Sequence, residues 1–432
     1  MAVLWHGAAA AAAPALQGWL ALRARRGKEI PARLPERRGI ERAPRPAGRL
    51  IWLHAASVGE AVSILPVLDA LRARDKALHL LVTTGTVTSA TLLGQRCAAG
   101  KEREGAAGMT MHRFVPLDVP AWGRRFLDHW RPDAAVFVES ELWPNLLAAC
   151  RRRRIPMALI NARLSARSHA RWRHVPGFAR HLLGGFALVQ PRGAADAARL
   201  AGLGAAGIVA PGDLKFAAAP LPANEAALEA LRARLAGRPV WLAASTHPGE
   251  EALVVAVHRR LAGAHPGLLT ILAPRHPERG ERIATEAQAA GVPATRRALG
   301  EMPPEAGVWI VDTMGEMGLW FRLSPIVFMG KSLLPPGGGQ NPLEPARLGC
   351  AVAIGPHAGN FADQIAALAG GGALARPADA GELGDWVDAM LRDPVARDAA
   401  GQAAAAVASR GSDLPDRTAA ALLALLPSAG SG

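Results

Sequence analysis

Short apolar runs and amphipathic segments alternate along most of the chain. Strands that alternate with helices form parallel sheets whose two faces are both covered by helices. The pattern therefore predicts an α/β protein with two doubly wound sheets. The runs expected to form strands are 50–56, 78–83, 134–139, 157–160 and 186–190 in the first half, and 239–244, 268–273, 308–312, 325–329 and 351–354 in the second.

A stretch rich in proline and alanine, from Pro211 to Pro222, separates the two series of strands and has the composition of a linker. A chain of 432 residues also exceeds what one hydrophobic core usually spans. We therefore predict two domains facing each other across a cleft, with ligands at the carboxyl ends of the strands. The expected divisions are an N-terminal segment 1–30, an N-terminal domain 31–215, a C-terminal domain 222–405, and a C-terminal helix within 406–432 that packs back toward the N-terminal domain.

The two halves differ in charge. Residues 1–216 hold 32 Lys and Arg against 15 Asp and Glu, whereas residues 217–432 hold 18 against 21. A half this basic suggests an anionic partner, which could be nucleic acid, a phosphorylated substrate or an acidic membrane surface. Nucleic acid is disfavoured, because only Trp172 and Phe178 lie among the arginines of that region to stack on bases.

The first 22 residues carry no formal charge and are followed by a basic cluster that includes Arg23 and Lys28. The uncharged stretch is mostly alanine and has few of the large apolar residues that drive insertion, so residues 1–30 are predicted to associate weakly with a membrane. A secretory signal is disfavoured, because no positive region precedes the apolar one. The three cysteines, Cys97, Cys150 and Cys350, form no C-x-x-C pair, and this indicates a reducing cytoplasm.

The segment HAASVGE, residues 54–60, follows the first apolar run and opens a helix. Ser57 and Glu60 fit the S-x-x-E capping box, in which each side chain satisfies a backbone donor at a helix N-terminus. In the alternative interpretation, the small residues let a substrate approach the backbone and Glu60 points into a crevice at the end of a strand. The segment alone leaves both interpretations open.

One motif is misleading. The glycines Gly202, Gly204 and Gly207 match the dinucleotide fingerprint G-x-G-x-x-G. That fingerprint needs a strand before it and a helix after it, but here a helical pattern comes first. We therefore interpret these glycines as the end of a helix.

Three loops in the second half have the composition of a nucleotide site. In the first, a strand ends in Pro274-Arg275, and arginine can fork onto a phosphate. In the second, Thr313 and Glu316 form a T-x-x-E pattern that predicts a capping box at a helix N-terminus, which suits an anion. The third, 330–345, is rich in glycine and leads to Glu344, a carboxylate that can bind ribose hydroxyls.

Several motifs together resemble the bacterial Kdo transferases, the 3-deoxy-D-manno-octulosonic acid transferases of lipopolysaccharide assembly. The resemblance runs in order from about residue 18 to the C-terminus. The motifs are HAASVGE, Val138-Glu139-Ser140-Glu141-Leu142-Trp143-Pro144-Asn145, Ile160-Asn161-Ala162-Arg163-Leu164-Ser165, Gly212-Asp213-Leu214-Lys215-Phe216, Ala273-Pro274-Arg275-His276-Pro277, Gly315-Glu316-Met317 and Gln340-Asn341-Pro342-Leu343-Glu344-Pro345.

The resemblance implies an inverting glycosyltransferase of GT-B architecture, with two Rossmann-like domains and neither metal nor cofactor. It would move Kdo from CMP-Kdo to the phosphorylated lipid A precursor, lipid IVA, at the cytoplasmic face of the inner membrane. It implies that Glu60 is the general base and that Glu139, chosen over Glu141, and Lys215 stabilise the transition state. The expected CMP contacts are Pro274, Arg275, Gly315, Glu316, Met317, Asn341, Pro342, Leu343 and Glu344; further contacts to acceptor or donor are expected at Ser57, Gly59, Glu141, Arg163 and Lys331.

Other functions remain open at this point. Another GT-B enzyme, either a UDP-sugar transferase or a sugar-nucleotide epimerase, would share the two-domain pattern.

The N-terminus also departs from many members of the family that the chain resembles, since alanine stands where they carry a leucine-rich anchor.

Overall fold

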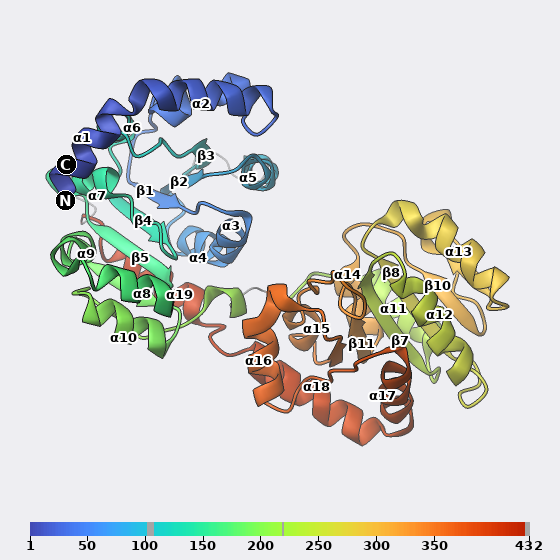
Figure 1. The fold of residues 1–432 in the computed structure, drawn as a ribbon. Helices are drawn as coiled ribbons and strands as arrows, with labels where there is room; N and C mark the ends of the chain where they lie inside the picture. The colour runs from blue at the N-terminus through green and yellow to red at the C-terminus, as the bar shows by residue number, and fades with distance from the viewer. Residues whose placement is uncertain (102–107, 218–219, 428–432) are drawn as a thin grey trace. The chain divides into compact units, whose positions relative to one another are not determined.

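The chain folds into two compact units (Figure 1). The computed structural model describes residues 1–101, 108–217 and 220–427, except the side chains of 95–101. The first unit comprises residues 1–218 together with 411–432, and the second comprises 219–410. Each unit contains one six-stranded sheet in which all pairs are parallel. The prediction of an α/β protein with two doubly wound sheets is confirmed.

The sheet of the first unit has the strand order β3-β2-β1-β4-β5-β6. Its strands are β1 (Leu50–His54), β2 (His79–Thr84), β3 (Thr110–Phe114), β4 (Ala134–Val138), β5 (Met157–Ala162) and β6 (Leu188–Pro191). Its helices are α1 (Ala2–Ala11), α2 (Ala13–Arg25), α3 (Val58–Ser63), α4 (Leu65–Arg74), α5 (Val87–Lys101), α6 (Pro120–Trp130), α7 (Pro144–Arg152), α8 (Ala166–Trp172), α9 (Pro176–Leu183), α10 (Ala194–Gly202) and α19 (Leu414–Leu423).

The sheet of the second unit has the order β12-β11-β7-β8-β10-β9. Its strands are β7 (Val240–Thr246), β8 (Leu269–Pro274), β9 (Ala294–Arg296), β10 (Gly307–Ile310), β11 (Ile326–Met329) and β12 (Ala351–Ile354). Its helices are α11 (Glu225–Leu235), α12 (Glu250–Leu261), α13 (Gly280–Ala289), α14 (Met317–Leu323), α15 (Leu343–Ala346), α16 (Ala362–Gly370), α17 (Ala380–Arg392) and α18 (Pro394–Ala408).

Successive residues of β1 face two separate cores. Leu50 and Trp52 belong to one apolar cluster, with α6, α7 and α9, whereas Ile51 and Leu53 belong to another, with α4 and α19. A parallel sheet covered on both faces produces this arrangement, which explains why its strands read as continuous apolar runs.

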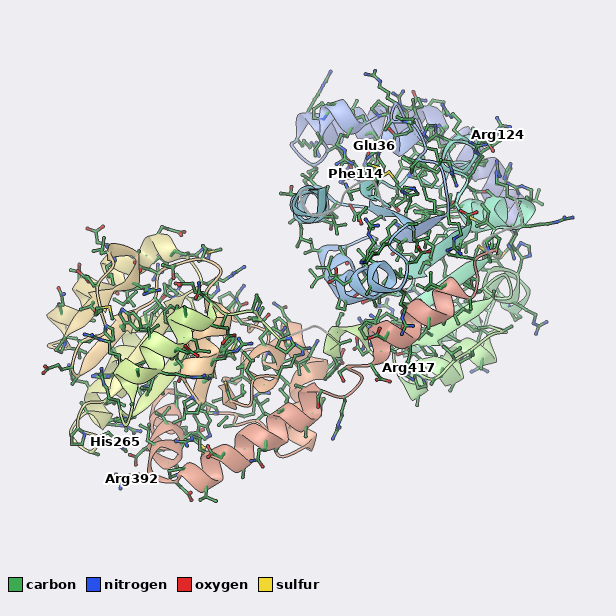
Figure 2. The ribbon with its side chains drawn as sticks, turned by 180° about the vertical axis from the view of Figure 1, so that it is seen from behind. Glu36, Phe114, Arg124, His265, Arg392 and Arg417 are labelled. Carbon is green, nitrogen blue, oxygen red and sulfur yellow. The ribbon has the colours of Figure 1, made fainter. Side chains whose placement is uncertain are left out.

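All ten apolar runs contain a strand, but β3 and β9 were not predicted. β3 alternates polar and apolar residues and lies at the edge of its sheet. The carboxylate of Glu36 accepts the backbone N–H of Phe114 at 2.7 Å, and Figure 2 labels both side chains. β9 has three residues and also lies at an edge. Residues of both strands are only partly buried, three of them in β9 and two in β3, so these two strands lack the continuous apolar runs of the other edge strands, β6 and β12, which are buried throughout.

The misleading glycine motif lies where the sequence indicated. α10 ends at Gly202, and Gly204 follows with a positive φ of 90°, a backbone conformation that favours glycine. No strand follows among the described residues of this segment, because Ile208 forms only an isolated bridge with Val189. The interpretation as a helix end is confirmed.

The last helix belongs to the first unit, although it is the last element of the chain. Leu414, Ala419 and Leu422 of α19 share an apolar cluster with Leu68 and Leu71 of α4. This unit is therefore built from two separate stretches of sequence.

The N-terminal helices pack on the first unit. The indole of Trp5 donates to Asp118 at 2.8 Å, and His6 lies 3.2 Å from the amide oxygen of Asn145. Leu20 is buried with Trp122 of α6. Within the described residues, no helix has the length and apolar character needed to cross a bilayer. Cys150 and Cys350 are buried free thiols, and the side chain of Cys97 lies outside the described part.

Candidate functional site

The chain reverses direction across the first sheet between β1 and β4. From β1 it proceeds to β2 and β3 on one side, and from β4 to β5 and β6 on the other. Such a switch point leaves a crevice at the carboxyl ends of the two central strands, where doubly wound folds bind ligands. The segment 54–60 follows β1, and Glu139 follows β4 directly. The fold therefore brings two of the motifs singled out in the sequence to this switch point.

The carboxylate of Glu60 is held at the N-terminus of α3. Ser57 is the N-cap and accepts the N–H of Glu60 at 3.3 Å, while its hydroxyl donates to one oxygen of Glu60 at 2.8 Å. The other oxygen accepts the N–H of Ala56 at 2.9 Å. The capping box predicted from S-x-x-E is confirmed, although its carboxylate reaches the backbone of Ala56 rather than that of the cap residue.

The environment of Glu60 favours its protonated form. The side chain is buried, with 9 % of its surface exposed. Burial raises the pKa of Glu60, the hydrogen bonds from Ser57 and Ala56 oppose that effect, and the negative charges of Glu141 and Glu139 add to it. A carboxyl group with a raised pKa beside two further carboxylates is typical of a site for proton transfer.

Glu139 lies beside Lys215. The ammonium of Lys215 is 3.3 Å from a carboxylate oxygen of Glu139. Glu139 has a positive φ of 55° and Asn161, at the end of the neighbouring β5, has one of 50°. Non-glycine residues in this conformation are strained and gather at functional sites. The amide oxygen of Asn161 also accepts the N–H of Leu214 at 3.1 Å, which holds the Lys215 loop against the sheet.

Glu141 has different partners. Its carboxylate accepts the indole N–H of Trp143 at 2.6 Å and lies 3.4 Å from the Nε2 atom of His54. Burial acts to raise the pKa of Glu141, but the interactions with His54 and Trp143 outweigh it and lower the pKa. Glu141 is therefore a weaker base than Glu60.

The remaining candidates of this unit lie at the same edge. Gly59 is exposed on α3, with open space where a side chain would be. Arg163 is exposed, and its backbone N–H donates to the carbonyl of Glu139 at 3.3 Å. The structure thus places Gly59 and Arg163 beside the residues that carry the carboxylates.

The second unit has an equivalent switch point between β7 and β11. The residue that follows β11 lies against the end of β7: a Cβ on Gly330 would lie 2.7 Å from the carbonyl oxygen of Ser245. Only glycine permits this approach. Ser245 and Lys331 both have positive φ angles, of 55° and 58°.

Glu250 joins the loops that follow β7 and β11, and the sequence analysis missed it. One carboxylate oxygen accepts the N–H of His247 at 3.0 Å and that of Lys331 at 2.6 Å. The other accepts the N–H groups of Ser332 and Leu333 at 2.7 and 3.0 Å. The side chain is 1 % exposed. Its sequence signal, an acidic residue in the first turn of a helix, is too common to identify it.

Charged side chains from three loops gather near His247. Burial lowers the pKa of His247, and Lys331 and Arg275 lower it further, while Glu250 opposes them. Burial raises the pKa of Glu344, while Asn341 and then Arg347 and Arg275 oppose that effect. The predicted phosphate and ribose contacts therefore lie within electrostatic reach of one another, with Pro274 at the end of β8.

The segment 341–344 forms the start of α15. The side-chain amide of Asn341 donates to Glu344 at 3.3 Å, and its oxygen accepts the N–H of Leu343 at 3.2 Å. Pro342 and Leu343 are buried. Asn341 thus fixes the orientation of the Glu344 carboxylate.

The prediction of a capping box at Thr313 is wrong. α14 begins only at Met317, with Glu316 as its N-cap and no side-chain cap. The hydroxyl of Thr313 instead donates to the Glu316 carboxylate, which also accepts from Arg297 at 3.1 Å. Burial acts to raise the pKa of Glu316, but these two interactions outweigh it and lower the pKa. Gly315, with a φ of 82°, turns the chain into this helix.

The described residues contain no group of three or more His, Cys, Asp and Glu side chains arranged to hold a metal ion.

Two solved structures share this fold at low sequence identity. A UDP-GlcNAc 2-epimerase from Neisseria meningitidis is 12% identical with a TM-score of 0.54, covering 87% of this chain and 100% of that one. A glycosyltransferase from Rickettsia africae is 13% identical with a TM-score of 0.52, covering 88% and 99%. The fold is the GT-B fold of glycosyltransferases and related epimerases.

Sequence comparison identifies the family. A family model described as 3-deoxy-D-manno-octulosonic-acid transferase (kdotransferase) matches residues 32–218. A 3-deoxy-D-manno-octulosonic acid transferase of Bordetella pertussis is 35% identical over 405 residues, 91% of this chain and 92% of that protein. A probable mitochondrial 3-deoxy-D-manno-octulosonic acid transferase of Arabidopsis thaliana is 34% identical over 380 residues, which cover 85% of this chain and 83% of that protein. The chain belongs to the Kdo transferase family, which confirms the resemblance stated from its motifs.

Proposed function

We propose that this protein transfers Kdo from CMP-Kdo to the phosphorylated lipid A precursor, lipid IVA, with inversion at the anomeric carbon. The observation that carries the proposal is the buried carboxylate of Glu60, whose raised pKa suits a general base, at the switch point of the first unit. Family membership supports the donor sugar. An acceptor hydroxyl must lose its proton as it attacks, and Glu60 accepts that proton.

Three carboxylates are candidates for the general base, and they differ in the groups that contact them. Glu139 is paired with Lys215, and Glu141 is held by His54 and Trp143. Glu60 accepts only one backbone N–H and one hydroxyl proton, both from neutral groups. Proton transfer is most efficient when the pKa of the base approaches the working pH, and this condition favours Glu60.

Lys215 supplies positive charge near the base. With Glu139 beside it, its ammonium stays fixed at the end of β4. A fixed cation stabilises the negative charge that develops as a phosphate leaves, without rearrangement during the reaction. We therefore propose that Lys215 stabilises the transition state and that Glu139 positions the Lys215 ammonium.

The proposal places CMP on the second unit. Arg275 would bind the phosphate, Glu344 the ribose hydroxyls, and the 315–317 segment together with Asn341, Pro342 and Leu343 would complete the site. The support is that Arg275 and Glu344 influence each other electrostatically at the carboxyl edge of the sheet.

Transfer of the sugar can be tested directly. The purified protein is incubated with CMP-Kdo and tetraacylated precursor, and mass spectrometry follows the mass of the acceptor. The expected product is the acceptor plus one or more Kdo residues, with release of CMP. A product formed from a UDP-sugar, with none from CMP-Kdo, would contradict the proposal.

We expect CMP to stabilise the folded protein more than UMP or UDP does. At a hundred times its dissociation constant, a ligand adds about 2.7 kcal/mol to the free energy of unfolding. Each kcal/mol raises the Tm by about 2–4 °C, so the Tm should rise by roughly 5–11 °C. Replacing Arg275 by Ala removes a charged hydrogen bond and should weaken CMP about 10- to 100-fold. Arg282→Ala, an exposed arginine of α13, is the control. Equal shifts from UDP and CMP would favour a UDP-sugar enzyme.

The proposal also places the protein at the cytoplasmic face of the inner membrane, bound through residues 1–30. The exposed apolar side chains of α1 and α2 are Val3, Leu4, Trp5, Trp19 and Leu22. Arg25, Arg26 and Lys28, at the end of α2 and just after it, are exposed as well. Apolar side chains next to basic ones suit the interface of an anionic leaflet.

We expect high salt to release the protein from anionic vesicles. Each basic residue contributes about 1 kcal/mol near an anionic leaflet, and salt screens that contribution. Replacing Arg25, Arg26 and Lys28 by Gln should therefore weaken vesicle binding, measured by co-sedimentation. The control replaces Arg259, Arg282 and Arg392 of the second unit, which are also exposed. Release by detergent alone would contradict peripheral attachment.

A further inference from the structure

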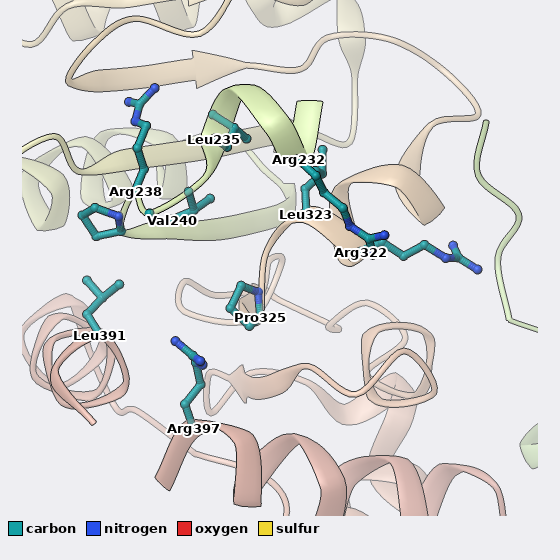
Figure 3. A pocket seen from close by; sticks show the side chains of 11 residues that line it. Arg232, Leu235, Arg238, Val240, Arg322, Leu323, Pro325, Leu391 and Arg397 are labelled. Atoms are coloured by element: carbon teal, nitrogen blue, oxygen red, sulfur yellow. The ribbon is translucent and has the colours of Figure 1, made fainter. Parts of the chain in front are cut away.

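The second unit has a hollow where strands β7 and β11 begin. The nucleotide loops lie at the opposite, carboxyl ends of the strands. The hollow has a volume of about 520 Å³. Val240, which begins β7, and Pro325, which directly precedes β11, both line it (Figure 3). Because the strands are parallel, the loops that carry Arg275 and Lys331 lie at the other ends, about 20 Å away along a seven-residue strand. The hollow is therefore separate from the site described above.

Four arginines line the hollow, each from a different segment. Arg232 belongs to α11, Arg238 to the turn before β7, Arg322 to the end of α14 and Arg397 to the first turn of α18. Figure 3 shows Arg397 extending from α18 toward Pro325. None of the eleven lining residues is acidic, and the structure describes every residue from 220 to 410.

The positive charge of these arginines is only partly neutralised. Arg238 and Arg322 donate to backbone carbonyls, the carboxylate of Glu305 acts electrostatically on Arg238, and Arg397 pairs with Asp398 at 2.9 Å. The side chain of Arg232 forms no hydrogen bond or ion pair with the described residues. The carbonyls are those of Gly267, Pro304 and Glu305 for Arg238, and of Leu221 and Gly318 for Arg322.

The rest of the lining is mostly aliphatic. Leu235, Val240, Leu323, Pro325 and Leu391 contribute side chains between the arginines. Pockets of 300–1,000 Å³ that combine apolar walls with a few charged groups bind small molecules. Guanidinium groups match the geometry of phosphate oxygens better than ammonium groups do. We propose that this hollow binds a phosphate monoester whose organic part is apolar.

Calorimetric titration of the full-length protein tests this proposal, with hexyl phosphate and inorganic phosphate as probes. We expect saturable binding of hexyl phosphate, about tenfold or more tighter than that of inorganic phosphate, because the aliphatic walls bury its chain. Arg232→Glu and Arg397→Glu should each weaken hexyl phosphate about tenfold or more, since each removes a charged contact and adds repulsion.

Arg259→Glu is the matched control, because Arg259 is exposed on α12 of the same unit but does not line the hollow. It should change the affinity less than either lining variant. The melting temperature of each variant reports whether it is folded, and Arg397→Gln replaces Arg397→Glu if the latter is not. Absence of saturable binding overturns the proposal, as does equal weakening by Arg259→Glu. A loss of affinity caused by Arg275→Ala alone would place hexyl phosphate at the nucleotide loops and overturn it as well.

Discussion

Glu60→Gln is expected to reduce the rate of Kdo transfer about 100- to 10,000-fold, the usual contribution of a general base. The amide keeps the shape of the side chain. Its oxygen can still accept the N–H of Ala56, and its NH₂ group can donate to the Ser57 hydroxyl, which replaces the two bonds of the carboxylate. The variant should therefore bind CMP normally while turnover, measured by mass spectrometry, falls.

The chain contains a matched control for this substitution. In α17, the N-cap Asp379 accepts the N–H of Glu382 at 2.9 Å, and the Glu382 carboxylate accepts the N–H of Ala378 at 2.8 Å. This is the same capping box, but both acidic side chains are exposed. Glu382→Gln should leave the rate unchanged. If Glu60→Gln also transfers Kdo at the parental rate, its carboxylate is only a cap and the base is another residue.

The pH dependence of the reaction provides a second measurement of Glu60. Burial and the nearby carboxylates raise its pKa, and only its ionised form accepts a proton. The rate of the parent should therefore fall as the pH decreases through this raised pKa. The Glu60→Gln variant should not show this decrease. The stability changes in the opposite sense: a raised folded-state pKa stabilises at low pH, and this contribution is lost as the pH rises through it. Glu60→Gln, which cannot ionise, should be no less stable than the parent at neutral pH.

Glu250→Gln is expected to destabilise the second unit by about 2–6 kcal/mol, because two backbone N–H groups lose their acceptor at about 1–3 kcal/mol each. Each oxygen of Glu250 accepts two backbone N–H groups. In glutamine the NH₂ group points its hydrogens at two of those donors, so two buried N–H groups lose their acceptor. At about 2–4 °C per kcal/mol, the melting temperature should fall by roughly 4–24 °C.

The same substitution should weaken CMP binding, because the loop that begins at Lys331 leads to Asn341 and Glu344. Glu281→Gln on α13 is the control, since that side chain is exposed and should change stability by at most about 0.5 kcal/mol. A Glu250→Gln protein that melts with the parent and binds CMP equally would show that the loops do not depend on this carboxylate.

The apolar runs predicted the central strands, because a strand buried on both faces requires apolar residues at every position. They did not predict β3, where His112 is buried on a polar edge strand. His112 is held by Thr84 at 2.9 Å and by Arg33 at 3.1 Å. Burial and the surrounding arginines lower its pKa to about 3. The neutral state of its imidazole therefore depends on contacts with residues distant in the sequence, which no local sequence pattern predicts.

The site was predicted where a motif resembles a family and missed where it depends on contacts between distant segments. The motifs predicted Glu60 and Glu139, and the structure places both at the switch point of the first sheet. Glu250 was not, because its four donors come from residues 3 and about 80 positions away. The pattern T-x-x-E at Thr313 was misread for a related reason: sequence gives the spacing of a capping box but not the residue at which the helix begins.

The contact between α4 and α19 has a consequence for biosynthesis. Ribosomes make the chain from its N-terminus, so the apolar surface of α4 emerges early, and the helix that covers it is made last. The whole of residues 219–410 must be translated in between. The first unit therefore stays incomplete, with aggregation-prone surface exposed, until α19 has been made. A nascent chain stalled before residue 411 should then bind chaperones through α4, even though its second unit is complete.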